Sequence, residues 1–189
     1  MAIQLPILFK ERLRELLPKD EYEPFLASYE RDFEPSLRVN TGKISIDDFK
    51  RLFSAQKLTP LSWSETGFFI ERKSPFSKTP YYHAGLFYIQ EAASMLPVEL
   101  MDIKPGEIIL DACASPGSKT TQILSKTANQ GLVIANEFRR DRVGRLLENV
   151  SRWGAGNCVI TNQATSAFKN MVEFFDKILL DAPCSGEGM

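Results

Sequence analysis

The sequence predicts an α/β protein in which a Rossmann-like parallel sheet follows a small α+β unit. Two observations lead to this fold class. From residue 107 onward, segments typical of strands alternate with segments typical of helices, whereas the first 80 residues show no such alternation. Strands and helices that alternate at this spacing form parallel sheets with right-handed crossovers. We therefore expect an amino-terminal α+β domain in residues 1–80 and a sheet domain in residues 81–189.

The amino-terminal residues are predicted to fold as short elements. Apolar side chains at helical spacing indicate two helices, the first beginning at Pro6 and the second capped by Asp20. The further elements are expected to be a strand at 37–40, a helix capped by Ser45 or Asp47 and reaching about residue 55, and strands at 58–63 and 67–71. Residues 72–80 hold two Pro and two Ser, so they are expected to form a loop.

The second part begins with residues 85–100, whose apolar and small side chains predict one helix. The alternating elements that follow are expected at 107–112 (strand), 118–128 (helix), 131–136 (strand), 138–152 (helix), 158–162 (strand), 166–172 (short helix) and 176–181 (strand). Because the last of these strands lies next to the end of the sequence, we expect a sheet that stops after its fourth strand.

The composition excludes several classes of protein. No apolar run approaches the ~18 residues of a membrane span, and the first residues lack the features of a signal peptide. Three widely spaced Cys argue against a disulfide framework and for a reducing compartment, so we expect a cytoplasmic protein without a membrane partner. No Cys or His spacing predicts a metal site. The net charge of −1 does not indicate a nucleic-acid binder, and the arginines between 139 and 152 are interpreted as a solvated helix face.

Each of three predicted strands ends at an acidic residue: Asp111, Glu137 and Asp181. Ligands of open α/β sheets bind at the carboxyl ends of the strands, so these side chains indicate a site for a nucleotide-like cofactor. An acid in the place of Glu137 can accept hydrogen bonds from both ribose hydroxyls. Gln90 and Ser94, one turn apart on the predicted helix, are expected to help cover this cofactor.

The loop after Asp111 leads through Pro116 and Gly117 into a helix. The free N–H groups at such a helix end suit the carboxylate of an amino acid, although an ordinary strand–helix turn is the alternative interpretation. The loop has neither the three-glycine dinucleotide fingerprint nor a Walker sequence.

The segment after the last predicted strand reads DAPC, residues 181–184. Pro183 fixes the backbone between Asp181 and Cys184, which sets the directions of both side chains. From these residues alone, Cys184 is predicted to be a nucleophile, and the alternative is a buried thiol at a strand end.

Two motifs together resemble those of the NOL1/NOP2/Sun family of RNA cytosine-5 methyltransferases. Residues 111–120 read DACASPGSKT, similar to the family's cofactor motif, and residues 181–188 read DAPCSGEG, similar to its active-site motif. Residues 85–92 and 38–41 also match the family pattern. Within the family the chain is most similar to the bacterial 16S ribosomal RNA methyltransferases of the RsmF type.

The resemblance implies a Rossmann-like methyltransferase that uses S-adenosylmethionine and acts on ribosomal RNA or the small ribosomal subunit. It assigns cofactor contacts to Asp111, Cys113, Ala114, Ser115, Pro116, Gly117, Ser118, Lys119, Glu137 and Asp181. Asp181 would also face the target cytosine. Cys184 would help to release the methylated base, because the family's attacking thiol belongs to a later motif that these 189 residues do not contain.

The sequence departs from the family pattern at Ala164, where the family has an Asp that binds the adenine amino group. Gln163 or a backbone group is the candidate substitute. Without the later motif we expect residues 1–189 to be inactive alone. Without strands beside the last one, we expect them to self-associate through its exposed edge or to be markedly less stable than the full enzyme. The alternatives are a fragment that binds S-adenosylmethionine or RNA without turnover, and a transfer-RNA cytosine-5 methyltransferase.

Overall fold

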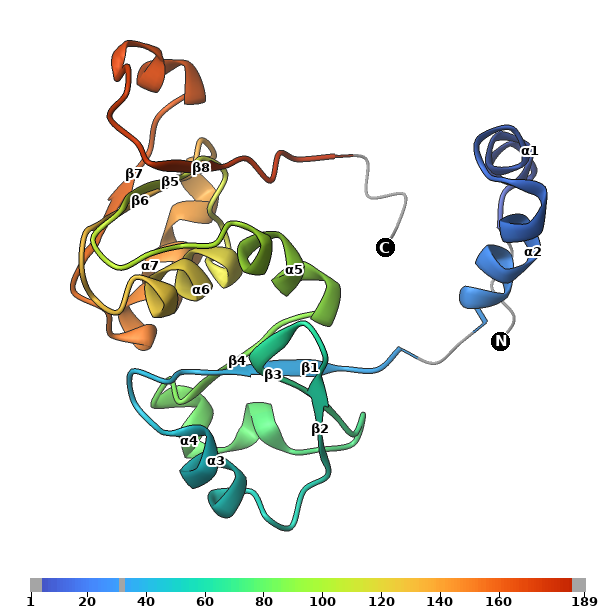
Figure 1. The fold of residues 1–189 in the computed structure, drawn as a ribbon, viewed down its shortest axis with the longest axis horizontal. Coiled ribbons are helices and arrows are strands. Elements are labelled where there is room, and N and C mark those ends of the chain that lie inside the picture. Colours follow the sequence, from blue (N-terminus) through green and yellow to red (C-terminus); the bar gives the residue numbers. More distant parts are fainter. Residues whose placement is uncertain (1–4, 31–32, 185–189) are drawn as a thin grey trace. The chain divides into compact units, whose positions relative to one another are not determined.

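A computed structural model of the chain describes residues 5–30 and 33–184. The chain forms two compact units, Met1–Glu34 and Pro35–Met189. The first unit consists of the helices α1 (Ile7–Leu16) and α2 (Lys19–Ser28), which are shown in blue in Figure 1. Both helices begin after a proline in extended conformation, and no side chain caps either one. The expected cap of the second helix by Asp20 is therefore wrong, because the helix starts at Lys19 and Asp20 lies inside its first turn.

The second unit begins with an antiparallel sheet of strand order β2-β3-β1-β4. Its strands are β1 (Ser36–Val39), β2 (Leu58–Leu61), β3 (Ser64–Ile70) and β4 (Phe87–Ile89). On one face lie α3 (Ile46–Leu52), η1 (Phe76–Lys78) and α4 (Pro80–His83) (Figure 1). Ser45 caps α3, as predicted, by accepting a hydrogen bond from the N–H of Asp48 at 3.1 Å. Five buried phenylalanines fill the core of this sheet: Phe49, Phe53, Phe68, Phe76 and Phe87.

The predicted helix over residues 85–100 is wrong in its first part. Residues 87–89 form the strand β4, which pairs with β1, and the helix α5 begins only at Ala92 and ends at Leu100. Gly85 ends the preceding turn with φ +72°, where a Cβ would lie 2.0 Å from the carbonyl oxygen of Arg152. The free edge of β1 then binds the apolar segment as a strand, so a tertiary contact overrides its local helical pattern.

The parallel sheet follows with strand order β7-β6-β5-β8. Its strands are β5 (Ile108–Asp111), β6 (Leu132–Asn136), β7 (Cys158–Thr161) and β8 (Lys177–Leu179), and all neighbouring pairs are parallel. The helices α5, α6 (Ser118–Lys126) and α7 (Arg140–Trp153) pack on one face, and the 3-10 helix η2 (Thr165–Asn170) follows β7. This arrangement confirms the predicted α/β fold with a four-stranded parallel sheet.

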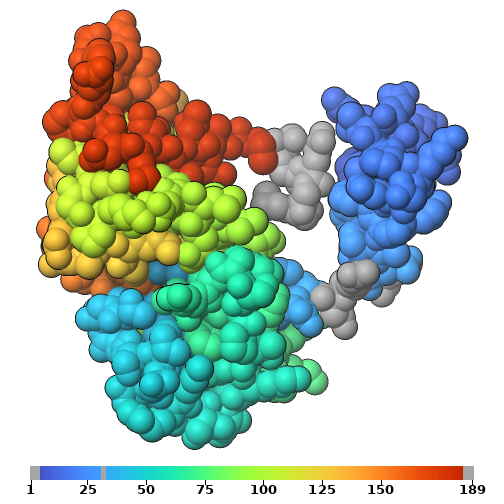
Figure 2. All heavy atoms as spheres, viewed as in Figure 1, coloured from blue at the N-terminus to red at the C-terminus, as the bar shows by residue number. Residues whose placement is uncertain are grey.

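The antiparallel sheet packs against the helical layer of the parallel-sheet part, so helices lie between the two sheets (Figure 1). Leu61, Ala92 and Met95 form a shared apolar cluster, and the indole N–H of Trp63 donates to the carbonyl of Ala92 at 3.1 Å. Figure 2 shows the atoms of the antiparallel sheet, in cyan to green, in direct contact with the yellow-green atoms of the parallel-sheet part. In the described part of the chain, no helix combines the length and the apolar character needed to cross a membrane.

Candidate cofactor site

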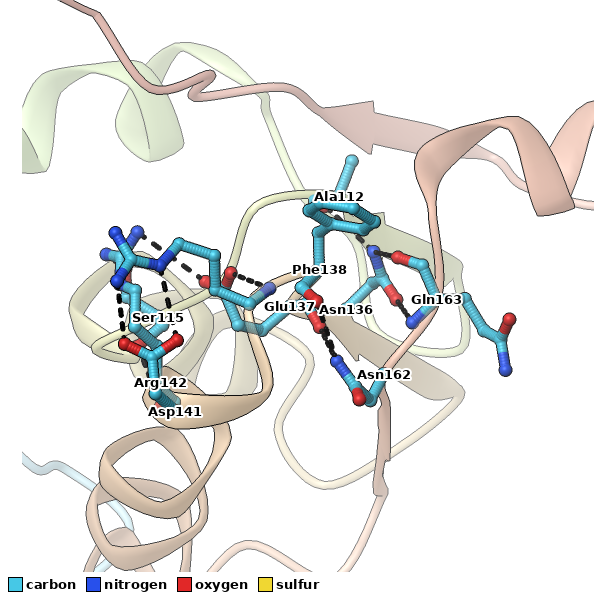
Figure 3. A network of polar contacts seen from close by, with 10 residues as sticks. Ala112, Ser115, Asn136, Glu137, Phe138, Asp141, Arg142, Asn162 and Gln163 are labelled. Carbon is cyan, nitrogen blue, oxygen red and sulfur yellow. Dashed lines mark hydrogen bonds and ion pairs between the residues drawn. The ribbon is translucent and has the colours of Figure 1, made fainter.

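The carboxyl ends of β5, β6 and β7 are held together by the side chain of Asn136, which is fully buried. Its Nδ2 donates to the carbonyls of Ala112 at 3.1 Å and Gln163 at 3.0 Å. Its Oδ1 accepts from the hydroxyl of Thr161 at 2.9 Å. It also accepts from the N–H of Gln163 at 3.0 Å (Figure 3). Asn136 therefore fixes the edge at which the acidic side chains emerge. Sequence reasoning missed it, although its place directly before Glu137 at a strand end was the available signal.

The loop between β5 and α6 is fastened on two sides. Its backbone is bonded to the neighbouring strand, with the N–H of Ala114 2.8 Å from the carbonyl of Asn136. On the other side, Nη2 of Arg142 donates to the carbonyl of Ser115 at 2.7 Å, and Asn149 donates to the carbonyl of Pro116 at 2.8 Å. The predicted solvated arginine face is thus only partly solvated, because Arg142 binds the loop.

The helix α6 begins after Gly117, whose φ of +103° belongs to the left-handed region that glycine adopts without strain. No side chain caps this helix, so the N–H groups of Ser118, Lys119 and Thr120 have no intrahelical acceptor. Free N–H groups together with the positive end of the helix dipole make an anion-binding position. This is the arrangement that the sequence predicted for the carboxylate of an amino acid.

Asp111 is buried at the end of β5 and accepts a hydrogen bond of 2.6 Å from the hydroxyl of Thr120. Burial raises the pKa of Asp111 to about 6, although the Thr120 hydroxyl and the Lys119 ammonium both favour the ionised form. The structure therefore shows Asp111 bonded to the first turn of α6. Its predicted contact with the cofactor stays a prediction.

Glu137 follows β6 and is 4% exposed. Its Oε1 accepts from the N–H of Arg139 at 2.8 Å, and its Oε2 lies 3.8 Å from Nη1 of Arg142 (Figure 3). One carboxylate oxygen is thus held by the backbone and oriented by it. The other has a long ion pair in place of a short hydrogen bond, so it retains the capacity to accept one from a ligand.

The cysteines of the two motifs differ in their surroundings. Burial, followed by the charges of Asp111, Glu137 and Asp181, raises the pKa of Cys113. A raised pKa keeps this thiol protonated at neutral pH. Cys184 is exposed, so the alternative of a buried thiol at that position is wrong. Among residues 5–30 and 33–184, no group of three or more His, Cys, Asp or Glu side chains is placed to hold a metal ion.

Two expectations about cofactor contacts change with the structure. Gln90 is 4% exposed and bonds to Arg38 and Gln122, so it and Ser94 do not form the predicted helical face over the cofactor. Phe138, which sequence reasoning passed over, follows Glu137 and is 67% exposed (Figure 3). Ala164 is exposed before η2, and both backbone groups of Gln163 are bonded to Asn136. A carbonyl oxygen can accept a second hydrogen bond, so the Gln163 side chain and a backbone group both stay candidates for binding adenine.

Comparison with known proteins gives two family matches that follow each other along the chain. Residues 5–92 match the N-terminal domain of 16S rRNA methyltransferase RsmF, and residues 98–189 match 16S rRNA methyltransferase RsmB/F. The chain belongs to this methyltransferase family. The RsmB/F match contains the Asp111 loop, Glu137 and the Asp181 segment described above.

Curated relatives agree with the RsmB/F assignment. The chain is 45% identical to ribosomal RNA small subunit methyltransferase F of Shigella dysenteriae and 44% identical to that of Escherichia coli. Each alignment takes in 100% of the chain but 41% of the relative, so the chain spans about two fifths of the length of these proteins.

Solved structures share the fold of this chain. A methyltransferase homolog protein from Pyrococcus horikoshii superposes with a TM-score of 0.79 at 33% identity, over 97% of the chain and 65% of the homolog. NSun6 from the same organism, solved with SFG, an analogue of S-adenosylmethionine, gives a TM-score of 0.84 at 20% identity, over 95% of the chain and 71% of NSun6. At that identity the NSun6 likeness shows the fold alone. The family is one of S-adenosylmethionine-dependent methyltransferases.

Proposed function

We propose that this chain supplies the cofactor-binding part of an enzyme that methylates carbon 5 of a cytosine in 16S ribosomal RNA. The observation that carries the proposal is that three acids are bonded around the uncapped start of α6: Asp111 to Thr120, Asp181 to Lys119, and Glu137 to the Arg142 that holds the preceding loop. The chain's likeness to ribosomal RNA small subunit methyltransferase F supports ribosomal RNA, within the small ribosomal subunit, as the partner.

The donor set of the site fits S-adenosylmethionine. The free N–H groups of α6 suit an amino-acid carboxylate, the available oxygen of Glu137 suits ribose hydroxyls, and exposed Phe138 offers an apolar ring to the base. When bound, the cofactor supplies the methyl group. The loop from Cys113 to Lys119 would hold it, while Asn136 and Arg142 keep that loop in place.

The remaining roles follow from the chemistry of the base. Carbon 5 of cytosine is a poor nucleophile until a thiolate adds to carbon 6, and a carboxylate near N3 then stabilises the adduct. Asp181, oriented by Lys119, is the proposed carboxylate. Cys184 is proposed to help release the methylated base, and the attacking thiol is proposed to lie outside residues 1–189. The target base must leave its stack to reach this site.

Two measurements test the proposal on the 189-residue chain. Calorimetry should show binding of S-adenosylmethionine in preference to NAD and ATP, and preference for NAD would overturn the cofactor assignment. Transfer of tritium from labelled S-adenosylmethionine to small-subunit RNA should be absent with this chain alone. Robust turnover would instead identify Cys184 as the nucleophile.

A further inference from the structure

Arg38 is a buried cation that links the antiparallel sheet to the helices α6 and α7. It lies on β1, between Leu37 and Val39, whose side chains enter the core of the antiparallel sheet, and it points to the opposite face. Its exposed fraction is 1%, and its guanidinium lies 4.4 Å from the ring centroid of Trp153 on α7. Burial lowers the pKa of Arg38 to about 9, so the side chain remains charged at neutral pH.

The hydrogen bonds of Arg38 lead to the first turn of α6. Nη2 donates to the hydroxyl of Thr121 at 2.7 Å and to the carbonyl of Ser118 at 3.2 Å, while Nε donates to Oε1 of Gln90 at 3.0 Å. The Thr121 hydroxyl in turn donates to the carbonyl of Ser118 at 3.0 Å. A residue of the antiparallel sheet thus holds the turn whose N–H groups form the anion-binding position.

These partners are neutral oxygens, and among the described residues Arg38 forms no ion pair; the Glu99 carboxylate attracts it from a longer distance. A buried charge without a counterion in direct contact costs more free energy than an apolar side chain of similar volume would. Packing alone therefore does not account for an arginine here. What a guanidinium adds over an apolar residue is a rigid fork of donors that can hold several oxygens in one geometry.

We infer that Arg38 is a positioning residue for the cofactor, which holds the first turn of α6 in the orientation that receives the cofactor's carboxylate. The inference rests on the proposed use of S-adenosylmethionine at this site. It makes cofactor affinity depend on the antiparallel sheet, because β1 carries the side chain that orients α6. Preorganised donors bind an anion more tightly than donors that must be ordered during binding.

The test compares four variants of the 189-residue chain at a temperature where circular dichroism shows each to be folded. Arg38→Met removes the hydrogen-bond donors. Arg38→Lys keeps the positive charge but has a shorter side chain. Thr121→Val removes one acceptor and leaves the side-chain volume nearly unchanged. Phe76→Leu is the control, because it loosens the aromatic core of the antiparallel sheet and does not contact α6. Calorimetry measures the affinity for S-adenosylmethionine. Hydrogen exchange without ligand measures the protection of amides 121–124, the first amides of α6 with intrahelical acceptors.

We expect Arg38→Met to weaken binding about tenfold or more, which corresponds to the loss of one charge-assisted hydrogen bond. Arg38→Lys should fall between Arg38→Met and the unmodified chain, Thr121→Val should weaken binding several-fold, and Phe76→Leu should leave affinity unchanged. Exchange of amides 121–124 should accelerate in the Arg38 and Thr121 variants alone.

Unchanged affinity and unchanged exchange in Arg38→Met would overturn the inference, as would an equal loss of affinity in Phe76→Leu. If Arg38→Met does not fold, Thr121→Val decides by the same criteria. Failure of the unmodified chain to bind S-adenosylmethionine would contradict the proposed function instead. The ligand-free exchange measurement would then still decide whether Arg38 orders the first turn of α6.

Discussion

The ammonium group of Lys119 lies 2.6 Å from a carboxylate oxygen of Asp181, and this ion pair joins the first turn of α6 to the segment after β8. The Lys119 side chain is 15% exposed and that of Asp181 is 57% exposed. Because water reaches the carboxylate, the pair orients Asp181 without contributing much to stability. The two motifs that sequence reasoning singled out therefore meet directly in the folded chain.

A double-mutant cycle with Lys119→Met and Asp181→Asn should give a coupling energy below about 1 kcal/mol in urea unfolding, because half-exposed ion pairs are screened by solvent. The ion pair of Lys104 and Asp102, whose two side chains are both exposed, is the matched control. Its coupling energy should be no larger than that of Lys119 and Asp181. A coupling well above that range would mean that the Lys119 pair is a major structural contact.

Asp111 should make stability fall as the pH rises from 4 to 7. Its folded pKa, about 6, lies above the ordinary value of 3.8, so the folded state binds the proton more tightly. This contribution to stability is complete below pH 4 and is lost as the pH rises through 6. Asp111→Asn removes this pH dependence. Between pH 4 and pH 7 the unfolding free energy of the variant should therefore rise by about 1–3 kcal/mol relative to that of the unmodified chain.

Urea unfolding at several pH values measures the effect of Asp111→Asn. Asp141→Asn is the control of opposite sign, because a hydrogen bond from Arg139 lowers the pKa of Asp141 and its contribution is lost as the pH falls. If the unfolding free energies of the unmodified chain and of Asp111→Asn changed with pH in parallel, the raised pKa of Asp111 in the folded state would be contradicted.

Glu137→Gln should weaken the binding of S-adenosylmethionine by about 1–3 kcal/mol, because the variant loses a charged acceptor for the ribose hydroxyls. Glutamine keeps an oxygen for the N–H of Arg139, so the backbone turn should survive. Glu148→Gln, an exposed acid on α7, should bind as the unmodified chain does. Calorimetry of the three proteins checks this, and equal affinities would rule out Glu137 as a cofactor ligand.

Asn136→Leu should lower the free energy of unfolding by at least about 2 kcal/mol, because it leaves two buried carbonyls and two donors without their partner. Thr161→Val removes only one of these four hydrogen bonds and should cost about 1 kcal/mol. Chemical denaturation of both variants gives the comparison. A loss in Asn136→Leu no larger than that in Thr161→Val would show that the four bonds do not act together.

The strand β8 should mediate self-association of the 189-residue chain. Among the described strands it pairs only with β5, and the side chains of Ile178 and Leu180 are 59% and 64% exposed. Unpaired apolar edges recruit other chains. Light scattering over a concentration series should show association that Ile178→Lys reduces and that Val172→Lys, outside the strand, does not. A monomer at all concentrations would disprove this.

The parallel sheet was predictable from the sequence because its strands and helices alternate and their ends are clear. Gly117 precedes α6, for example, and Asn136 ends β6. It failed at residues 85–91, where the partner strand β1, some 50 residues away in sequence, decides the conformation. The acidic residues of the site were predictable from strand ends. The residues that hold the site, Asn136, Arg142 and Arg38, were not, because their roles depend on carbonyl groups brought close only by folding.

The two family matches meet between residues 92 and 98, but the physical chain is not divisible there. Asn40 donates to the carbonyl of Trp153 at 2.9 Å, and Lys43 donates to the carbonyl of Arg152 at 2.7 Å. Both acceptors lie at the carboxyl end of α7, which a protein beginning at residue 98 would leave without these donors. The boundary between the family matches is therefore a poor place to cut the gene for expression, and a cut near residue 35 keeps every one of these bonds.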